Sequence, residues 1–486
     1  MMRCLFIGLD AFDPDVLQEG VRRGDFPALA QLLSRSRSFE TTTDPGTYVG
    51  SLWATIHTGV DPSQHGLYCW ADLEPGTYRV RLSDERHIDV ESFWTRLSRA
   101  GYRSAIVDIP HCKLDPDING VHVINWLTHF KTVEGLATAP PELADELAHR
   151  FGLDPVPHCN AIDHSPEGLA RFTEAMLARV AWRTEFALEL MASGDFDLVA
   201  LGYGESHCVG HQCYHQHLAD RFSASDPVLR VYRAIDRAVG QLVDACPDDC
   251  AIVLLASHGM GPHFDGSHLA DRLLRKVDRA LNAARPIPLG RRLLDLVEAN
   301  RLRKLLGPAA RLLPPQLPRS AYYRAFVVPN NEVALGIRVN VEGREPAGLV
   351  APDEYDGYLD ALQGVLMNAR RLEDGSPAFV EALRTSRLYG TDPMRSGLPD
   401  LMLTWDRSRP FIGIEIPGIA RFMAEPRSVR TGDHRAGGLA VLAGPAGHNA
   451  GPAAPMDSSD IAHHVLSIFD VAGPPRPSRS AMAGSH

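Results

Sequence analysis

The sequence predicts an α/β fold with a mostly parallel sheet and helices on both of its faces. Short apolar runs typical of buried strands alternate with longer segments of helical periodicity, a pattern that favours parallel strands joined by helices. Polar residues directly follow three of these runs, at Asp10, Glu205 and Ser257. Because active sites of such sheets gather at the carboxyl ends of strands, we expect these positions to meet in one crevice.

The expected elements of the first half have clear boundaries. The first strand ends at Asp10, and a stretch that begins at Ser51 has helical spacing and stops at Gly59. Ser165 is placed to cap a long amphipathic helix. The expected strands cover residues 3–9, 104–108, 197–201 and 251–256, and the expected helices cover residues 26–33, 51–59 and 166–192.

The composition changes in the second half. Residues 271–320 are rich in Arg, Leu and Pro and lack strand signals, which predicts a helical insertion with a basic face. The later expected elements are strands within 325–341, a helix over 354–372, a strand over 398–405 and a helix over 460–471. The Pro- and Ser-rich tail after Gly473 is expected to be disordered.

Composition also limits the classes of function. The chain has 486 residues, 44% of them hydrophobic, which is ample for a large core. A net charge of −11 and a pI near 6.0 disfavour nucleic acid and anionic membranes as partners. The apolar run at the N-terminus is too short for a secretion signal, and no stretch suits a membrane helix, so we expect a cytoplasmic protein. The eight cysteines lack a CxxC pair and are expected to be reduced packing residues.

Three polar clusters carry the candidate chemistry. The first holds His207, His211 and His215, which share one face of the helix expected there and are typical ligands of zinc. The second is the pair Ser257 and His258 at a strand tip, and the third places His434 in a Gly-rich loop. The alternatives are a solvated helix face, an ordinary strand end and a common loop; four histidines within eleven residues favour a metal or catalytic role.

Taken in order, these clusters resemble the alkaline phosphatase superfamily, and most closely its type I phosphodiesterase/nucleotide pyrophosphatase branch. The shared order is an Asp after the first strand, a hydroxyl before Thr-Gly-x-x-Pro-x-x-His-Gly, a spaced acid/His pair, a strand ending at His-Gly-Met, and a late Gly-x-His. The supporting segments are residues 8–10, 58–66, 257–260, 337–346 and 399–401. The resemblance spans residues 3–472 except the insertion.

The resemblance implies an alkaline-phosphatase-like fold with an inserted cap region. The implied α/β metallohydrolase core takes in residues 1–263 and 395–473, the cap takes in 264–394 with the basic insertion at 271–320, and the tail is 474–486. In this family two metal ions, usually zinc, flank a Ser or Thr nucleophile. One ion is held by the first Asp, the nucleophile and an Asp-His pair, and the other by an Asp and two His.

The family's metal ligands carry over only in part. Asp10 and His258 match ligands of the first ion, and His211 and His434 match ligands of the second. With His207 the second set becomes a three-histidine site with an open fourth position. The expected cofactor is therefore zinc, as one or two ions, with manganese as the alternative.

Two family carboxylates are missing, because His207 and Ser257 stand where the family has Asp. Their loss reduces the ligand set of the first ion most, and Glu205 and Asp433 are the candidates to compensate.

The nucleophile is also displaced. Val49 occupies the family position and has no hydroxyl. We favour Ser51, two residues on at the start of a helix, as both the nucleophile and a metal ligand, with Thr47 as the alternative.

These observations predict a metal-dependent hydrolase that cleaves a phosphate ester through a Ser or Thr nucleophile. The alternatives are a sulfatase, a phosphonate hydrolase or a transferase on the same fold, and a non-catalytic relative that binds a phosphorylated ligand. A Cys-x-Pro-x-Arg motif is absent near residue 49, which disfavours the sulfatase. The expected partner is a small anionic phosphorylated or sulfated substrate; a homo-oligomer is possible.

Overall fold

The computed structural model describes most of the chain as two compact units. The described residues are 2–43, 46–47, 50–128, 135–156, 158–160, 162–282, 319–330, 333–426, 428–444 and 451–476, with only the backbone at 451–452. The first unit takes in Met1–Cys69, Ser83–His263 and Ser428–Ser478, and the second takes in Trp70–Leu82, Phe264–Arg427 and Arg479–His486. The region 264–394, expected as an insertion, falls in the second unit.

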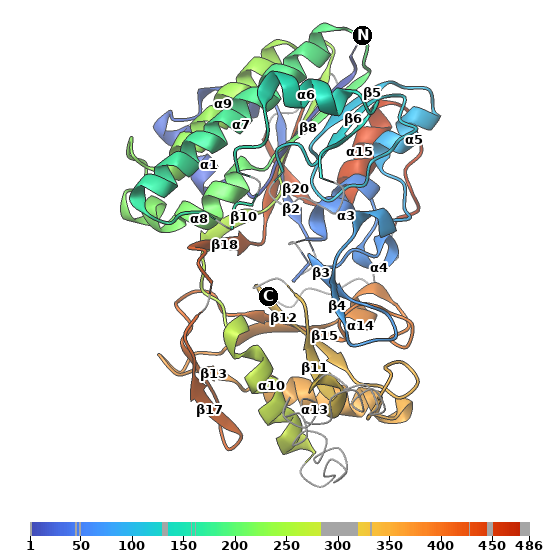
Figure 1. The fold of residues 1–486 in the computed structure, drawn as a ribbon, viewed down its shortest axis with the longest axis vertical. Helices are drawn as coiled ribbons and strands as arrows, with labels where there is room; N and C mark the ends of the chain where they lie inside the picture. Colours follow the sequence, from blue (N-terminus) through green and yellow to red (C-terminus); the bar gives the residue numbers. More distant parts are fainter. Residues whose placement is uncertain are drawn as a thin grey trace, which may run out of the picture. The chain divides into compact units, whose positions relative to one another are not determined.

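A nine-stranded sheet forms the centre of the first unit, in the order β20-β2-β19-β9-β1-β8-β5-β6-β7 (Figure 1). Its strands are β1 Cys4–Leu9, β2 Arg37–Thr42, β5 Ser104–Val107, β6 Gly120–Ile124, β7 Ala137–Ala139, β8 Leu198–Tyr203, β9 Ala251–Ala256, β19 Gly438–Ala443 and β20 Gly451–Asp457. The run from β9 to β6 is parallel throughout, and β2 is parallel to β20. Strand β19 pairs antiparallel with both β2 and β9, and β7 pairs antiparallel with β6. The predicted mostly parallel sheet is confirmed.

Helices cover both faces of this sheet, as predicted. In Figure 1, α7 and α9 lie on one side of the strands and α5 and α15 on the other. Strand β1 shows the cause: Leu5 and Ile7 belong to the core that includes Leu229 of α9, whereas the ring of Phe6 lies 5.7 Å from that of Phe93 in α5. The helices of this unit are α1 Pro14–Arg23, α2 Pro27–Ser34, α3 Leu52–Thr58, α4 Pro62–His65, η1 Glu85–His87, α5 Phe93–Arg99, α6 Leu143–Phe151, α7 Pro166–Ala192, α8 Glu205–Ala219, α9 Pro227–Asp244 and α15 Asp460–Ile468.

A two-stranded antiparallel ribbon stands apart from the large sheet and joins two of the polar clusters. It pairs β10 (Gly259–Pro262) with β18 (Gly432–Arg435), so that Met260 lies opposite His434. Both segments read as Gly-rich loops in the sequence, because four residues are too few to show a strand period.

The second unit combines antiparallel sheets with two packed helices. A four-stranded sheet has the order β11-β12-β15-β14, a three-stranded sheet the order β13-β16-β17, and β3 pairs with β4. Its core joins Leu273 of α10 and Leu362 of α13 to Ile337 of β12 and Leu403 of β15. Its elements are β3 Ala71–Leu73, β4 Val80–Leu82, α10 Ser267–Leu281, η3 Arg319–Tyr322, β11 Ala325–Val328, β12 Ala334–Val339, η4 Pro352–Glu354, α13 Tyr355–Leu366, β13 Arg370–Arg371, β14 Phe379–Arg384, α14 Thr385–Tyr389, β15 Leu401–Trp405, β16 Gly413–Ile416 and β17 Ala420–Met423.

The expected helix over 354–372 is wrong in its last turns. Helix α13 ends at Leu366, and Arg370 and Arg371 pair with Glu415 and Ile414 of β16. That pairing joins positions more than forty residues apart, which local periodicity cannot register.

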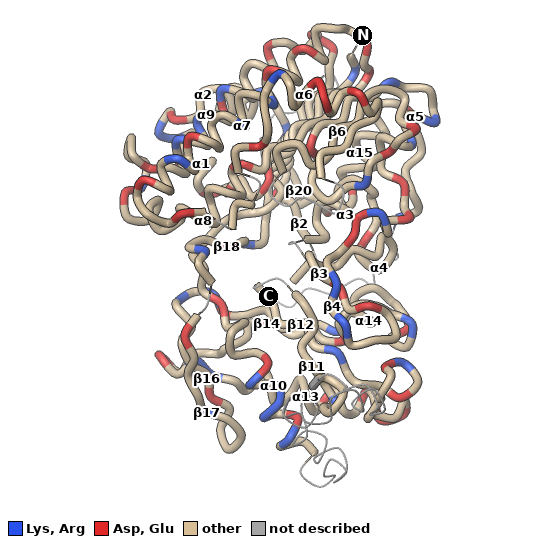
Figure 2. Tube along the Cα trace, in the orientation of Figure 1, with Lys and Arg blue, Asp and Glu red and all other residues tan. Residues whose placement is uncertain are grey.

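Two other expectations fall partly outside the described residues. Helix α10 supplies the start of the expected basic insertion, with basic and acidic positions interspersed along it (Figure 2), whereas residues 283–318 lie outside the described ranges. Residues 477–486 of the expected tail also lie outside them.

Two compositional features have structural counterparts. Within the described ranges even the longest helix, the 27-residue α7, lacks the apolar stretch that a membrane crossing requires. All eight cysteines lie among the described residues, and all but Cys246 are buried.

Candidate metal centre

Three buried histidines converge in the first unit. His207 and His211 lie one turn apart on α8, and His434 lies on β18. The Nε2 atom of His211 is 3.2 Å from that of His207 and 3.1 Å from that of His434, and the donor atoms of all three lie within 4.8 Å of one another. Tetrahedral zinc with Zn–N bonds of about 2.0–2.1 Å needs ligand nitrogens roughly 3.3 Å apart. The arrangement therefore fits a metal ion bound by three imidazoles.

Backbone contacts fix the orientation of this triad. The Nδ1 atom of His211 is 2.7 Å from the carbonyl oxygen of Gly432, so Nδ1 carries the proton and Nε2 offers its lone pair. The amide of Thr431 donates to the carbonyl of His211 at 2.8 Å. A Cβ atom at Gly432 would stand 2.2 Å from the carbonyl oxygen of Gly210, so only glycine lets β18 approach α8 closely enough to bring His434 to the site.

The other histidines of α8 do not join the triad. The side chain of His215 is exposed, although the four-residue spacing placed it with His207 and His211. His217 is buried, and its Nδ1 lies 2.7 Å from the Oδ2 of Asp226, the residue that caps α9. His215 therefore lies outside the triad although it shares the helical spacing of His207 and His211, because one turn further along the helix the side chain reaches solvent.

Asp10 and His258 lie beside the triad in a hydrogen-bonded group. The Oδ1 atom of Asp10 is 2.8 Å from the indole nitrogen of Trp53 and 3.2 Å from the hydroxyl of Ser257. The Ser257 hydroxyl also accepts the amide of Ala11 at 3.1 Å and lies 3.2 Å from Nδ1 of His258. The ring of His258 stacks on that of His434, with centroids 4.5 Å apart. Burial lowers the pKa of His258.

Trp53 reaches Asp10 because of a glycine in β1. A Cβ atom at Gly8 would stand 2.5 Å from the Trp53 ring, so the indole lies in the space that a side chain would fill. Trp53 was not a candidate from sequence, since nothing local to it signals a contact 43 positions away.

The two candidate nucleophiles are adjacent and buried. The hydroxyl of Ser51, which stands at the N-terminus of α3, donates to the carbonyl of Thr47 at 2.5 Å. Ser51 has no exposed surface and Thr47 is 3% exposed. Val49 lies outside the described residues. The contact from Trp53 brings the first turn of α3 next to Asp10.

Glu205 does not compensate for a missing carboxylate, contrary to one sequence-based alternative. Both of its oxygens accept hydrogen bonds from Arg183, at 2.9 and 2.8 Å. Arg183 also donates to Asp108 at 3.1 Å, and all three side chains are buried. The charge of the Glu205 carboxylate is already neutralised by this buried ion pair, so Glu205 does not serve as a metal ligand. The hydrogen bonds of Arg183 join α7 to α8 and to the end of β5.

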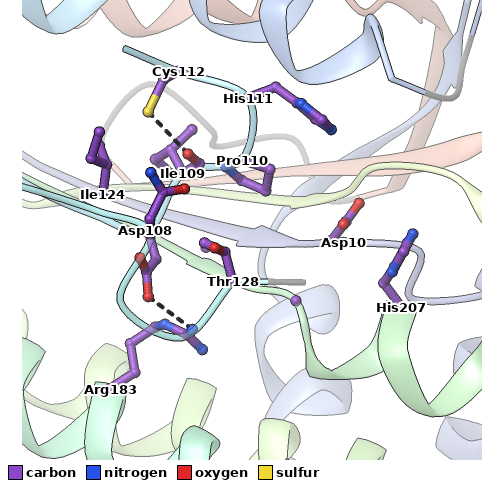
Figure 3. Close-up of a pocket in the computed structure, with 13 residues that line it drawn as sticks. Asp10, Asp108, Ile109, Pro110, His111, Cys112, Ile124, Thr128, Arg183 and His207 are labelled. Carbon is purple, nitrogen blue, oxygen red and sulfur yellow. Dashed lines mark hydrogen bonds and ion pairs between the residues drawn. The ribbon is translucent and has the colours of Figure 1, made fainter. Parts of the chain in front are cut away.

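A pocket adjoins the triad at the carboxyl ends of β5, β6 and β8 (Figure 3). Asp10 and His207 line it, together with His111, Asn125 and Thr128. Non-glycine residues with positive φ gather here: Asp108 and His111 have φ of 51° and Asn125 has 58°. Such backbone strain clusters at functional sites, so the pocket extends the metal centre as a candidate substrate site.

Comparison with known proteins identifies the family of the chain. A family model described as type I phosphodiesterase/nucleotide pyrophosphatase matches residues 4–408, whereas no curated protein sequence matches the chain. Murine ectonucleotide pyrophosphatase/phosphodiesterase 5 is similar in structure, with a TM-score of 0.52 and 13% identity over 99% of this chain and 98% of that one. An inactive form of the murine protein is in complex with AMP.

Phosphonoacetate hydrolase from Sinorhizobium meliloti 1021, in complex with phosphonoformate, has a TM-score of 0.53 and 15% identity over 96% of this chain and 95% of that one. At such identities the likeness shows the fold alone, and that fold is alkaline-phosphatase-like.

Proposed function

We propose that this chain, which belongs to the type I phosphodiesterase/nucleotide pyrophosphatase family, hydrolyses a phosphate ester at a metal centre held by His207, His211 and His434. The convergence of the three Nε2 atoms is the observation that carries the proposal. The lone pairs of these three Nε2 atoms repel one another unless a cation or a proton lies between them. A bound cation would therefore stabilise the triad.

We further propose that one ion, zinc or manganese, is the main cofactor. In the family pattern that the sequence resembles, two divalent ions and three aspartates leave one net positive charge. Here His207 and Ser257 replace two of those aspartates, so a single ion with Asp10 leaves the same charge. The Oδ1 of Asp10 receives hydrogen bonds from neutral donors, which makes the site of the family's first ion, at Asp10 and His258, the weaker of the two.

The protein groups divide the work of hydrolysis. A bound ion supplies positive charge that stabilises a phosphoryl group and lowers the pKa of a nearby hydroxyl. The Ser51 hydroxyl attacks phosphorus, with Thr47 as the second candidate, and the contact between Trp53 and Asp10 holds the first turn of α3 beside the centre. The Arg183–Glu205 pair fixes the start of α8, two residues before His207.

A small anionic phosphorylated substrate fits this centre. Similar structures in complex with AMP and with phosphonoformate support a ligand of that class. A phosphonate is the second candidate, favoured by the likeness to phosphonoacetate hydrolase.

Metal analysis and a substrate panel test the proposal. Purified protein should carry about one zinc or manganese ion per chain. It should turn over p-nitrophenyl phosphate or bis-p-nitrophenyl phosphate faster than p-nitrophenyl sulfate, and phosphonoacetate tests the second candidate. A metal-free protein that hydrolyses none of them after zinc or manganese is added would instead be a non-catalytic relative.

A further inference from the structure

His111 enters the pocket beside the metal centre from the segment that follows β5. It lines the pocket together with Asp10 and His207, and the three side chains surround the same space in Figure 3. Its ring is 20% exposed, whereas the carboxylate of Glu85, 3.0 Å from its Nδ1, is 4% exposed. A buried carboxylate therefore orients an imidazole that the pocket can reach.

The backbone of His111 is held as firmly as its ring. Nε2 of His57 donates to the His111 carbonyl at 3.0 Å, and Nδ1 of His57 lies 3.0 Å from the hydroxyl of Ser92. His111 has a φ of 51°, a conformation that costs a non-glycine residue free energy. The two contacts maintain that conformation, and with it the direction of the imidazole.

The surroundings favour the protonated imidazole. Burial alone would lower the pKa of His111, but the hydrogen bond and charge of Glu85, with the charge of Asp10, hold it above its ordinary value. His57 lies behind the backbone with its pKa lowered to about 4 by burial, so it is neutral at physiological pH and adds no charge. His207 faces the same pocket from α8.

We propose that His111 donates a proton to the leaving-group oxygen of the substrate and that Glu85 is its positioning residue. This inference rests on the proposed function and adds a catalytic residue to it. In the family pattern two ions serve the nucleophile and the leaving oxygen between them, whereas the single proposed ion here serves both; the centre keeps its net charge but loses one electrophilic group. An imidazolium in the adjoining pocket offsets that loss.

The proton balance closes over the two steps of hydrolysis. In the first, the nucleophile enters as an alkoxide, having already lost its proton to solvent, and forms a bond to phosphorus; the bond from phosphorus to the leaving oxygen breaks, and that oxygen takes the proton from His111. In the second, water attacks phosphorus, the nucleophile leaves, and the proton released by water returns to the imidazole of His111. Ester and water give alcohol and phosphate, and His111 is unchanged.

A leaving-group series tests proton donation. His111→Gln should slow hydrolysis of phenyl phosphate, whose leaving oxygen needs the proton, by about 100-fold or more. It should slow hydrolysis of p-nitrophenyl phosphate, whose anion leaves without help, by less than about tenfold. The matched control is His87→Gln, since His87 is an exposed histidine two residues from Glu85 and should leave both rates unchanged.

Other results with the two esters would overturn either the role of His111 or the proposed function. Equal losses for both esters, or no loss for either, would overturn the role of His111 and leave the proposed function intact. A wild-type protein that hydrolyses neither ester would overturn the proposed function and this inference with it. Bound metal and the midpoint of thermal unfolding should match wild type in the His111→Gln protein, so that lost activity reports chemistry.

The pH profile tests the positioning role of Glu85. Glu85→Gln removes the charge that favours the imidazolium, so the basic limb of kcat should move to lower pH, whereas Glu85→Asp should restore part of the shift. An unchanged basic limb in Glu85→Gln would overturn the coupling of Glu85 to His111.

Discussion

The two halves of the candidate centre differ in what satisfies their polar atoms. In one half, the Nε2 atoms of His207 and His434 lie 3.2 and 3.1 Å from that of His211. In the other half, the Asp10 carboxylate receives hydrogen bonds from Trp53 and Ser257. The proposed cation would stabilise the first arrangement, whereas the second holds together through neutral donors.

This difference is the basis of our proposal that the centre holds one ion where the family pattern has two, on the same fold. Ser257 in place of a family aspartate removes a charge and supplies a donor to the remaining carboxylate. A lone carboxylate bonded to two neutral donors has less need of a metal partner than two carboxylates facing each other. The predictions below separate the two halves, from the largest expected effect to the smallest.

Loss of the central imidazole should have the largest effect. His211→Ala should remove the bound metal and lower kcat/KM for phosphate esters by roughly 1,000-fold or more, the scale expected for a group that stabilises the transition state. The control is His215→Ala, on the exposed face of the same helix. Elemental analysis and steady-state kinetics check the result; metal content unchanged by His211→Ala would rule out the triad as the binding site.

Loss of the attacking hydroxyl should have a similar effect on rate and none on metal content. Ser51→Ala should lower kcat by about 1,000-fold while ligand binding and bound metal persist, because chemistry and not the pocket is removed. The buried hydrogen bond to Thr47 is also lost, at a cost of about 1 kcal/mol in the free energy of unfolding, so thermal unfolding is measured alongside.

Thr47→Ala completes that experiment. If Thr47→Ala abolishes turnover and Ser51→Ala does not, the nucleophile is Thr47, on the N-terminal side of the family position at Val49. If both variants remain active, the attacking oxygen comes from water.

The sequence predicted the parts of the fold that local patterns encode. Strands such as β9 and helices such as α7 have their expected bounds, with Ser165 capping α7. Three of the four matched ligands could be named because they follow strands or lie on one helix: Asp10, His211 and His258. His434 was a candidate from its Gly-rich loop, but only the family resemblance joined it to His211, since its place beside α8 depends on the pairing of β10 with β18.

Long-range contacts account for what the sequence did not reveal. Trp53, Arg183 and His111 act through partners at Asp10, Glu205 and Glu85, which lie 43, 22 and 26 positions away. None stands in a local motif, and a tryptophan or arginine within a helix reads as ordinary packing or surface. The predicted end of α13 was wrong, and the exposure of His215 was not foreseen, because tertiary packing and not helical period decides both.

Restoring a family carboxylate at position 257 should make the Asp10–His258 half of the centre bind a metal ion, as the histidine triad is proposed to do. Ser257→Asp adds a charge beside Asp10 and His258, so a second ion should bind and metal content should rise from about one to about two per chain. A gain of roughly tenfold in second-site affinity, about 1.4 kcal/mol, is enough to detect by titration. Ser257→Asn, of similar size but uncharged, is the control, and an equal gain with Asn would contradict the charge argument.

The smallest expected effect is the pH dependence of stability due to His65, a buried histidine outside the candidate metal centre. It is a reference for the histidines of the triad. His65 is 1% exposed, with Nε2 at 3.0 Å from the hydroxyl of Thr55 and Nδ1 accepting the amide of Leu67 at 3.1 Å. Burial lowers its pKa to about 3, below the ordinary value in the unfolded chain. The unfolded state therefore takes up the proton first as pH falls, and stability that is complete above about pH 6.5 is lost below it.

For His65 alone the loss at pH 5.5 is about 1.4 kcal/mol. Chemical unfolding of metal-stripped protein between pH 5.5 and 7.5 measures it, because stripping removes the separate contribution of the triad. The His65→Gln protein should be less stable at pH 7.5, since its cavity was shaped for an imidazole, yet its stability should fall less on acidification. Parallel pH dependences in the two proteins would show that His65 is not held neutral, and would leave the acid sensitivity of the fold to other buried histidines such as His57 and His122, whose pKa values burial also lowers.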